Sequence, residues 1–314
     1  MRAAAIVVNF NGGGDLPECL AALRAQTTPV EVVLVDCAST DGTRSLAEAP
    51  PSGVRGLALA ANLGYAGGCA AGLGVLAPDV EVVGFFNPDC FPSSAYFAVC
   101  EEILSTGRDV GGVAGRLVRP DGATLDSCGQ VLTRFLLRVR DRGYGEPAAG
   151  AYLVTADVLA ACGAGMVYLR KALVDASVGG EVLPSDYFAF WEDLDLGWRV
   201  SNAGWRVVYE PRAVAVHRRA ATAGPGTGRL IFRRPPELGA AIIANRWATL
   251  LRNLHLVDFC LRLPVLLPGE LMMLSWLALR NPRLVPALVR TFPRLRRAAR
   301  QRAMIARRRL GQLP

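Results

Sequence analysis

The segment from Ala4 to Gly14 reads AAIVVNFNGGG, an apolar, β-branched run that ends abruptly in asparagines and glycines. The same pattern returns at 32–43, VVLVDCASTDGT, and at 80–89, VEVVGFFNPD. Continuous apolar runs of this length are typical of strands in a parallel sheet with helices on both faces. Leucines at helical spacing between 15 and 25 supply a connecting helix. These stretches predict an α/β fold with a mostly parallel central sheet flanked by helices.

Each predicted strand ends in a polar or glycine-rich turn, at 9–14, 36–42 and 87–89. In an open parallel sheet, ligands bind in the crevice beyond the carboxyl ends of the strands. We therefore expect the three turns to converge on one site. Further strands are expected at 205–209 and 214–217, and the arginine-rich segment 116–150 is expected to be an excursion of strands.

The composition is that of a protein with a large core: 314 residues, 52% hydrophobic and 20% charged. The eight cysteines include no C-x-x-C pair and lie in apolar or glycine-rich surroundings. This usage is typical of buried thiols in a reducing compartment, and it argues against a zinc cluster or a disulfide framework. The apolar run at 1–10 is too short for a secretory signal, so we expect a cytoplasmic protein.

The positive charge is concentrated at one end of the chain. Residues 281–314 contain ten arginines and no acid. Because the formal net charge of the whole chain is +8, the remaining residues together carry about −2. From Pro236 onward the pattern is helical, and we divide the chain into a domain at 1–235 and a helical, basic extension at 236–314. The extension is expected to bind an anionic membrane surface. A solvated basic helix is the open alternative.

Two parts of this extension carry the membrane hypothesis. The run Leu263–Leu279 is apolar but has Glu270 near its middle and two prolines at its start, which favours a helix on the membrane surface over one that spans it. In the tail, apolar residues from Leu295 to Leu310 form an imperfect stripe that is expected to face lipid. Apart from Phe292 the tail has no aromatic residue, so no specific nucleic-acid binding is expected.

Carboxylates stand where the predicted strands end. Asp36 follows one buried run and can accept hydrogen bonds from a base or ribose, or simply cap a turn. Asp89 follows another run through the restrained turn Asn87-Pro88. One carboxylate together with ligand phosphates is a common way to hold Mg²⁺ or Mn²⁺, although the same tripeptide is also an ordinary turn.

The segment 188–199, FAFWEDLDLGWR, places three acids within four positions behind an aromatic cluster. Mutual repulsion is expected to raise the pKa of at least one of Glu192, Asp193 and Asp195, which suits a general base. Asp195 is expected to pair with Arg199 one helical turn on. His217 ends an apolar run and is either structural or a metal ligand, whereas His255 is assigned no role.

Seven motifs in this order resemble family 2 glycosyltransferases, the inverting GT-A group, and in particular bacterial rhamnosyltransferase-like members. They are IVVNFNGG from Ile6, VVLVDCASTDGT from Val32, NLGYAGG from Asn62, FFNPD from Phe85, CGAGMVYLR from Cys162, FWEDLDLGWR from Phe190 and AVAVH from Ala213. NRWATLLRN from Asn245 is a further family-like stretch. The resemblance covers about the first 220 residues and implies a GT-A nucleotide-sugar-binding fold for the domain at 1–235.

The resemblance also implies roles for single residues. Asp193 would be the catalytic base, with Glu192 beside it shaping the acceptor pocket. Asp89 would hold a divalent metal, Mg²⁺ or Mn²⁺, on the donor diphosphate, and His217 would complete or support that site. The residues implied along the nucleotide-sugar are Val8, Phe10, Asp36, Asn62, Gly64, Gly68, Asn87, Asp89 and Gly165.

The implied activity is that of a metal-dependent hexosyltransferase in cell-envelope polysaccharide synthesis. It would move a sugar, with dTDP-rhamnose as one possible donor, to a hydroxyl of a lipid-linked or glycan acceptor at the inner face of the membrane. Arg218, Arg219 and the loop to Gly228 form a candidate lid, with surface charge as the alternative. A non-catalytic nucleotide-sugar-binding or scaffold protein with a lipid- or nucleic-acid-binding tail is the second hypothesis. Cys37 and the segment 178–188 depart from the family pattern.

Overall fold

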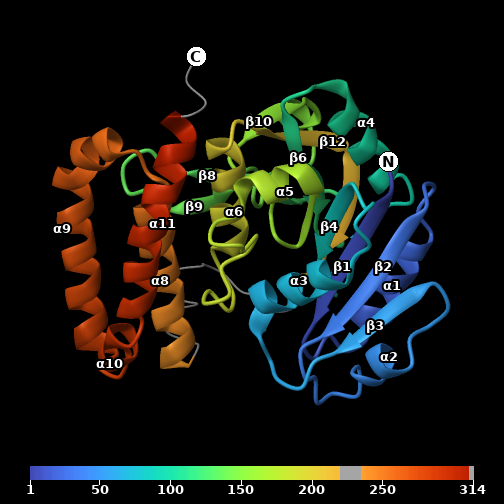
Figure 1. The fold of residues 1–314 in the computed structure, drawn as a ribbon, viewed down its shortest axis with the longest axis horizontal. Coiled ribbons are helices and arrows are strands. Elements are labelled where there is room, and N and C mark those ends of the chain that lie inside the picture. Colours follow the sequence, from blue (N-terminus) through green and yellow to red (C-terminus); the bar gives the residue numbers. More distant parts are fainter. Residues whose placement is uncertain (220–234, 311–314) are drawn as a thin grey trace.

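The computed structural model describes residues 1–219 and 235–310, which build a large sheet with helices on both faces and a layer of C-terminal helices at one end (Figure 1). The sheet has ten strands, and its main path runs β10-β12-β6-β11-β4-β1-β2-β3. The strands on this path are β1 Ala3–Asn9, β2 Val30–Asp36, β3 Val54–Ala58, β4 Val82–Phe86, β6 Val110–Val118, β10 Ala156–Val158, β11 Gly165–Leu169 and β12 Arg206–His217.

The three strands predicted from their apolar runs lie side by side and parallel. In β1, Asn9 stands opposite Asp36 of β2, and Val7 stands opposite Phe86 of β4. All seven residues of β1 are buried because helices cover both faces. The prediction of buried parallel strands is therefore confirmed for β1, β2 and β4, whose ends meet at one edge, whereas β11 runs antiparallel to both β4 and β6.

Helices pack on both faces of this sheet, and the buried side chains on each face form a separate apolar cluster. On one face lie α1 Asp15–Arg24, α2 Ser45–Glu48 and α4 Tyr96–Thr106, and on the other lie α3 Gly64–Val75, α5 Arg170–Ala176 and α6 Glu192–Asn202. Gly68 shows how closely α3 approaches β1, because a Cβ atom there would meet the Val8 side chain at 2.4 Å.

The segment 116–150 is an excursion of short strands, as predicted. β7 Leu125–Ser127 pairs with β6, and β8 Gln130–Leu132 pairs with β9 Val139–Asp141 as a separate hairpin. In that hairpin Gln130 stands opposite Asp141. β5 Cys90–Pro92 pairs with the end of β12, and a short 3₁₀ helix covers Gly150–Leu153.

The C-terminal layer consists of α8 Pro236–Asn253, α9 Leu256–Arg280, α10 Leu284–Val289 and α11 Phe292–Leu310. α8 packs against α6 and α11, and Ala248 and Ala298 belong to the same buried cluster as the α3 face of the sheet. The described cysteines are free thiols, of which six are buried. The extension thus shares its core with the sheet, and the proposed boundary at residue 235 stays a prediction.

One expectation about these helices is wrong in part. Two residues of the predicted α11 stripe do not face outward: Ala298 and Ile305 are 0% and 5% exposed, because they pack toward the protein interior, whereas Ala299 and Ala306 are exposed. α9 begins at Leu256 and contains both Pro264 and Pro268. The outward apolar surface belongs to α9.

Candidate functional site

Asp193 lies in the first turn of α6 with both carboxylate oxygens accepting hydrogen bonds. Its Oδ2 accepts from the Gly163 amide at 2.9 Å and from Gln130 Nε2 at 2.8 Å, and its Oδ1 accepts from the Leu194 amide at 2.8 Å. Burial raises the pKa of Asp193, and the donors only partly offset that effect. A carboxylate oriented in this way and raised in pKa is suited to accept a proton.

Glu192 is buried beside it. Burial and the neighbouring Asp193 carboxylate hold the pKa of Glu192 well above its usual range. Its Oε2 is buried and accepts no hydrogen bond within the described chain. The expectation that crowding would raise a pKa in this motif is confirmed, with burial as the larger cause. Tyr65 adds to the crowding, since its hydroxyl donates to the Gly163 carbonyl and lies near both acids.

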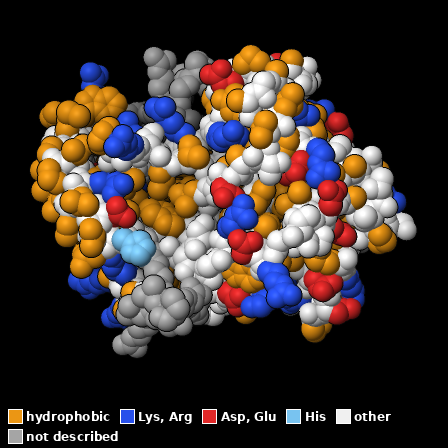
Figure 2. All heavy atoms as spheres, turned by 90° about the horizontal axis from the view of Figure 1, so that it is seen from above, with side chains coloured by type: hydrophobic (Ala, Val, Ile, Leu, Met, Phe, Trp, Pro, Cys, Tyr) orange, Lys and Arg blue, Asp and Glu red, His pale blue; other side chains and the backbone are white. Residues whose placement is uncertain are grey.

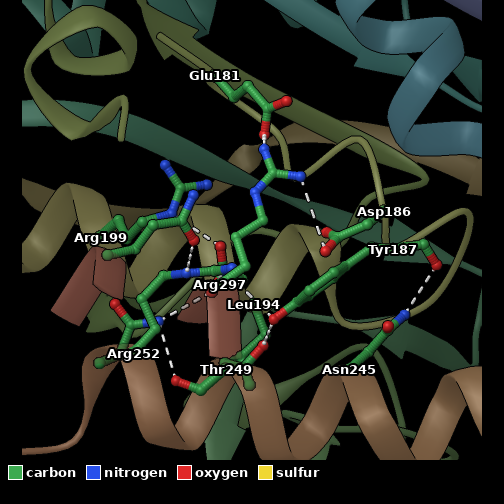
Figure 3. A network of polar contacts seen from close by, with 12 residues as sticks. Glu181, Asp186, Tyr187, Leu194, Arg199, Asn245, Thr249, Arg252 and Arg297 are labelled. Atoms are coloured by element: carbon green, nitrogen blue, oxygen red, sulfur yellow. Dashed lines mark hydrogen bonds and ion pairs between the residues drawn. The ribbon is translucent and has the colours of Figure 1, made fainter. Parts of the chain in front are cut away.

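Asp195, the third acid of the motif, has a structural role. It is fully buried between two guanidinium groups, with Arg199 Nε at 2.8 Å and Arg252 Nη1 at 2.6 Å. Burial alone would raise its pKa, but Arg252 and Arg199 together lower it. The predicted pairing with Arg199 is confirmed, and Figure 3 shows how the same network joins α6 to α8 and the C-terminal helix α11.

Asp89 and His217 face each other at the edge of the sheet, with 3.4 Å between Asp89 Oδ1 and the ring Nε2. The other ring nitrogen, Nδ1, lies 2.7 Å from Oδ2 of Asp126. Burial alone would lower the pKa of His217, but the carboxylates of Asp126 and Asp89 raise it to about 9. The structure thus brings together the two residues predicted as metal ligands.

Arg219 connects this pair to the acidic helix. Its guanidinium contacts Asp126 through Nε at 2.5 Å and Asp141 through Nη2 at 2.6 Å. Asp141 is near enough to Asp193 to raise the pKa of Asp193. Arg218 instead pairs with Asp15 and Glu18 of α1. The rest of the predicted lid, from residue 220, lies outside the described residues.

Three of the residues predicted to bind the nucleotide-sugar lie at or next to the ends of β1 and β2. Asp36 is fully buried and accepts hydrogen bonds from Asn9 Nδ2 at 2.7 Å and the Ser39 amide at 3.0 Å, so it braces the turns after β1 and β2. Phe10, at the end of β1, is 51% exposed, and its ring is accessible to a flat ligand. The buried Val8 lies under α3.

Asn62 and Gly64 shape the start of α3. Asn62 Oδ1 accepts from the Gly64 amide at 2.8 Å, and Gly64 has φ +70°. A Cβ atom at Gly64 would meet the Phe188 carbonyl oxygen at 2.3 Å, so only glycine allows this approach. Gly68 lies against Val8, as described above. These glycines therefore bring α3 close to its neighbours.

Asn87 directly follows β4, and Gly165 is the first residue of β11, the antiparallel neighbour of β4. The Asn87 amide donates to the Ala164 carbonyl at 3.1 Å, and Gly165 pairs with Phe86 inside the core. A Cβ atom at Gly165 would come 3.2 Å from Cys90 Sγ, a close packing contact. Of the glycines in the 162–170 motif, it is Gly163 that contacts Asp193.

Sequence reasoning missed four residues of this site: Asp126, Gln130, Asp141 and Asn245. The first three come from the turn-rich excursion, where the strands have three residues each and show no clear periodicity. Asn245 stands in the NRWATLLRN stretch, which the sequence singled out without a role. Their partners are far away in sequence, so only folding reveals the contacts.

Comparison with known proteins identifies the family of the chain. The model of "Glycosyl transferase family 2" matches residues 4–173. An N-acetylglucosaminyl-diphospho-decaprenol L-rhamnosyltransferase of Mycobacterium tuberculosis (strain CDC 1551 / Oshkosh) is 32% identical over 246 residues, which are 70% of this chain and 76% of the relative.

Solved glycosyltransferases share the fold. S. aureus TarS 1-349 in complex with UDP-GlcNAc superposes with a TM-score of 0.57 at 17% identity, over 99% of this chain and 88% of that one. A mannosyltransferase from Pyrobaculum calidifontis with GDP-Man and Mn²⁺ superposes with a TM-score of 0.54 at 20% identity, over 98% of this chain and 86% of that one. GalNAc-T7 with UDP, GalNAc and Mn²⁺ superposes with a TM-score of 0.60 at 12% identity. The match covers 80% of this chain and 48% of that protein.

The fold is thus that of a GT-A glycosyltransferase. The chain belongs to glycosyl transferase family 2.

Proposed function

We propose that this glycosyltransferase moves L-rhamnose from dTDP-rhamnose, with inversion, to a hydroxyl of a lipid-linked N-acetylglucosaminyl diphosphate in cell-envelope polysaccharide synthesis. The observation that carries the chemistry is the Asp193 carboxylate, buried, raised in pKa and oriented by Gly163 and Gln130. The acceptor class is supported by the Mycobacterium relative, which is named for that acceptor.

The reaction is a single displacement. Asp193 takes the proton of the acceptor hydroxyl, the hydroxyl oxygen forms a bond to the anomeric carbon, and the bond to the nucleoside diphosphate breaks with its electron pair on the leaving oxygen. Attack opposite the leaving group inverts the anomeric centre. Phe10 and the turn braced by Asp36 form the wall for the nucleotide, and Glu192 borders the acceptor side.

Asp89 and His217 fit a divalent cation, Mg²⁺ or Mn²⁺. One carboxylate and one imidazole face each other, and the Asp126 carboxylate on the second ring nitrogen is the usual support of a metal-binding histidine. Within residues 1–219 and 235–310 no three acidic, histidine or cysteine side chains converge on one point, so donor phosphates and water would supply the other ligands. A cation held by Asp89 and His217 would offset the charge that develops on the diphosphate.

The C-terminal layer is proposed to rest on the inner face of the membrane. None of the described helices is both long and apolar enough to cross a bilayer. Eleven large apolar side chains of α9 are nevertheless exposed, including Leu261 at 73%, Met272 at 71% and Leu279 at 84%. Figure 2 shows this apolar surface at the end of the molecule formed by α9, with arginines between. Such a surface binds lipid by burying apolar area and by attracting anionic headgroups.

The test is nucleoside diphosphate release from dTDP-, UDP- and GDP-sugars with the lipid-linked acceptor, with Mn²⁺ or Mg²⁺ and after EDTA. Wild type is expected to act on dTDP-rhamnose, and Asp193→Asn is expected to lose about 10² to 10⁴ in rate while still binding nucleotide. Full activity of Asp193→Asn would refute the assignment of the base. Nucleotide binding without release across the whole panel would favour the non-catalytic hypothesis.

A further inference from the structure

The loop before the acidic motif, Tyr187–Trp191, has an unusual backbone. Phe188, Phe190 and Trp191 have φ values of 60°, 72° and 74°, in the left-handed region that non-glycine residues rarely adopt. Three such residues among four consecutive positions do not stay in this form without external support. Trp191 directly precedes Glu192, so the conformation of the loop determines how α6 begins.

One side chain from α8 contacts three backbone carbonyls of this loop. Asn245 is fully buried, and its Nδ2 donates to the carbonyl oxygens of Tyr187 at 2.9 Å, Ala189 at 3.1 Å and Phe190 at 2.8 Å. Its Oδ1 accepts from Arg294 of α11. Figure 3 shows the Asn245 amide directed at the Tyr187 backbone from the α8 helix below.

The same loop also contacts the wall predicted for the donor. The Phe188 carbonyl accepts from the Ala66 amide of α3 at 3.2 Å, and Gly64 lies against Phe188. The loop therefore lies between the start of α3 and the start of α6. A change in its backbone moves Glu192 and Asp193 relative to Gly163 and to α3.

We infer that Asn245 is a positioning residue for the acidic pair: it holds the left-handed backbone of Tyr187–Trp191 and, through that loop, the first turn of α6. It does not touch substrate. The inference rests on the proposed role of Asp193, and it assigns the C-terminal helices a function in building the active site, because α8 supplies the amide and α11 orients it.

The test compares Asn245→Asp with Thr249→Val in the full chain. Asn245→Asp keeps the size and the Arg294 contact but removes the three donated hydrogen bonds. Thr249→Val is the matched control, since Thr249 is one turn along α8 and its buried hydroxyl lies 2.8 Å from the Tyr187 hydroxyl. It loses a buried hydrogen bond to the same loop but leaves the backbone contacts in place.

Two readouts are needed: amide hydrogen exchange of the peptide 186–194, and steady-state kinetics with dTDP-rhamnose, Mn²⁺ and the lipid-linked acceptor. For Asn245→Asp we expect at least tenfold faster exchange in that peptide and at least a tenfold lower kcat, with the KM for donor changed less than threefold. Thr249→Val is expected to stay within threefold of wild type in all three. Adding Phe188→Gly to Asn245→Asp should recover at least threefold of the lost kcat, because glycine tolerates the left-handed backbone.

Unchanged exchange in Asn245→Asp, or equal losses in Thr249→Val, would overturn the inference. If Asn245→Asp does not fold, Asn245→Ala is measured in its place, with the same criteria. If wild type itself is inactive with this donor and acceptor, the proposed function is wrong, and the exchange comparison alone decides whether Asn245 holds the loop.

Discussion

The Nδ1 atom of His217 lies 2.7 Å from the Asp126 carboxylate, which is 91 residues earlier in the chain. This contact makes the ring present Nε2 toward Asp89. Such carboxylate support fixes the orientation and tautomer of a ligating histidine, and its removal typically costs about 10- to 100-fold in metal affinity.

Asp126→Asn is therefore expected to weaken Mn²⁺ binding by about 10- to 100-fold. Mn²⁺ binding in the presence of dTDP, followed by electron paramagnetic resonance, measures this directly. Asp141→Asn is the matched control because it also loses an ion pair with Arg219 but leaves the Asp126 contact intact. Equal Mn²⁺ affinity in wild type and Asp126→Asn would show that His217 is not a ligand.

Glu192→Gln is expected to raise the melting temperature at pH 7. The pKa of Glu192 is higher in the fold than in the unfolded chain, so the folded state holds the proton more tightly, and stability falls as pH rises above the unfolded pKa of about 4.3. Glutamine removes this cost. Thermal melts from pH 4 to 8 should show the gain grow with pH, whereas a gain independent of pH would contradict the buried-charge account.

Arg252→Leu is expected to destabilise the protein by about 3 kcal/mol, since it leaves the buried Asp195 carboxylate paired with one guanidinium, that of Arg199, instead of two. Because Arg252 and Arg199 lower the pKa of Asp195, their contribution is present above the unfolded value of about 3.9 and is lost as pH falls further. Urea unfolding at pH 7 measures the loss. Arg300→Leu, an exposed arginine on α11, should change stability by less than about 0.5 kcal/mol.

Replacement of Leu261, Met272 and Leu279 by serine is expected to reduce flotation with anionic liposomes more than tenfold. Burial of each such side chain in the interface contributes about 1.5 to 3 kcal/mol. A triple variant at Leu153, Val154 and Val174, which are also exposed but lie outside α9, is the control. Equal flotation of both triple variants would show that membrane binding does not depend on the exposed face of α9.

The local sequence pattern was sufficient to predict several strands of the sheet and the position of the site. Apolar runs that end in polar turns predicted β1, β2 and β4, and with them the edge where Asp36 and Asp89 lie. Crowding of the acids at 192–195 predicted a raised pKa for at least one of them, although burial is the larger cause in the fold. These features depend on neighbours within a few residues, where periodicity and charge are directly visible.

Other predictions failed or were not possible because they depend on what a surface packs against. The stripe of α11 had the pattern of a lipid-binding face, yet Ala298 and Ile305 are covered by the protein. An apolar stripe shows only that a face is buried, and the partner is chosen by the tertiary arrangement.

The sequence by itself therefore predicted the parallel strands of the sheet and the family, and it led to the acids that we propose as the catalytic pair. Only the tertiary structure decided which groups orient those acids: Gln130 on Asp193, Asp126 on His217 and Asn245 on the loop before Glu192. Each is a polar contact between residues more than 50 positions apart. Such contacts leave no periodic trace in the sequence, because hydrogen-bond geometry depends on the folded backbone that brings the two groups together.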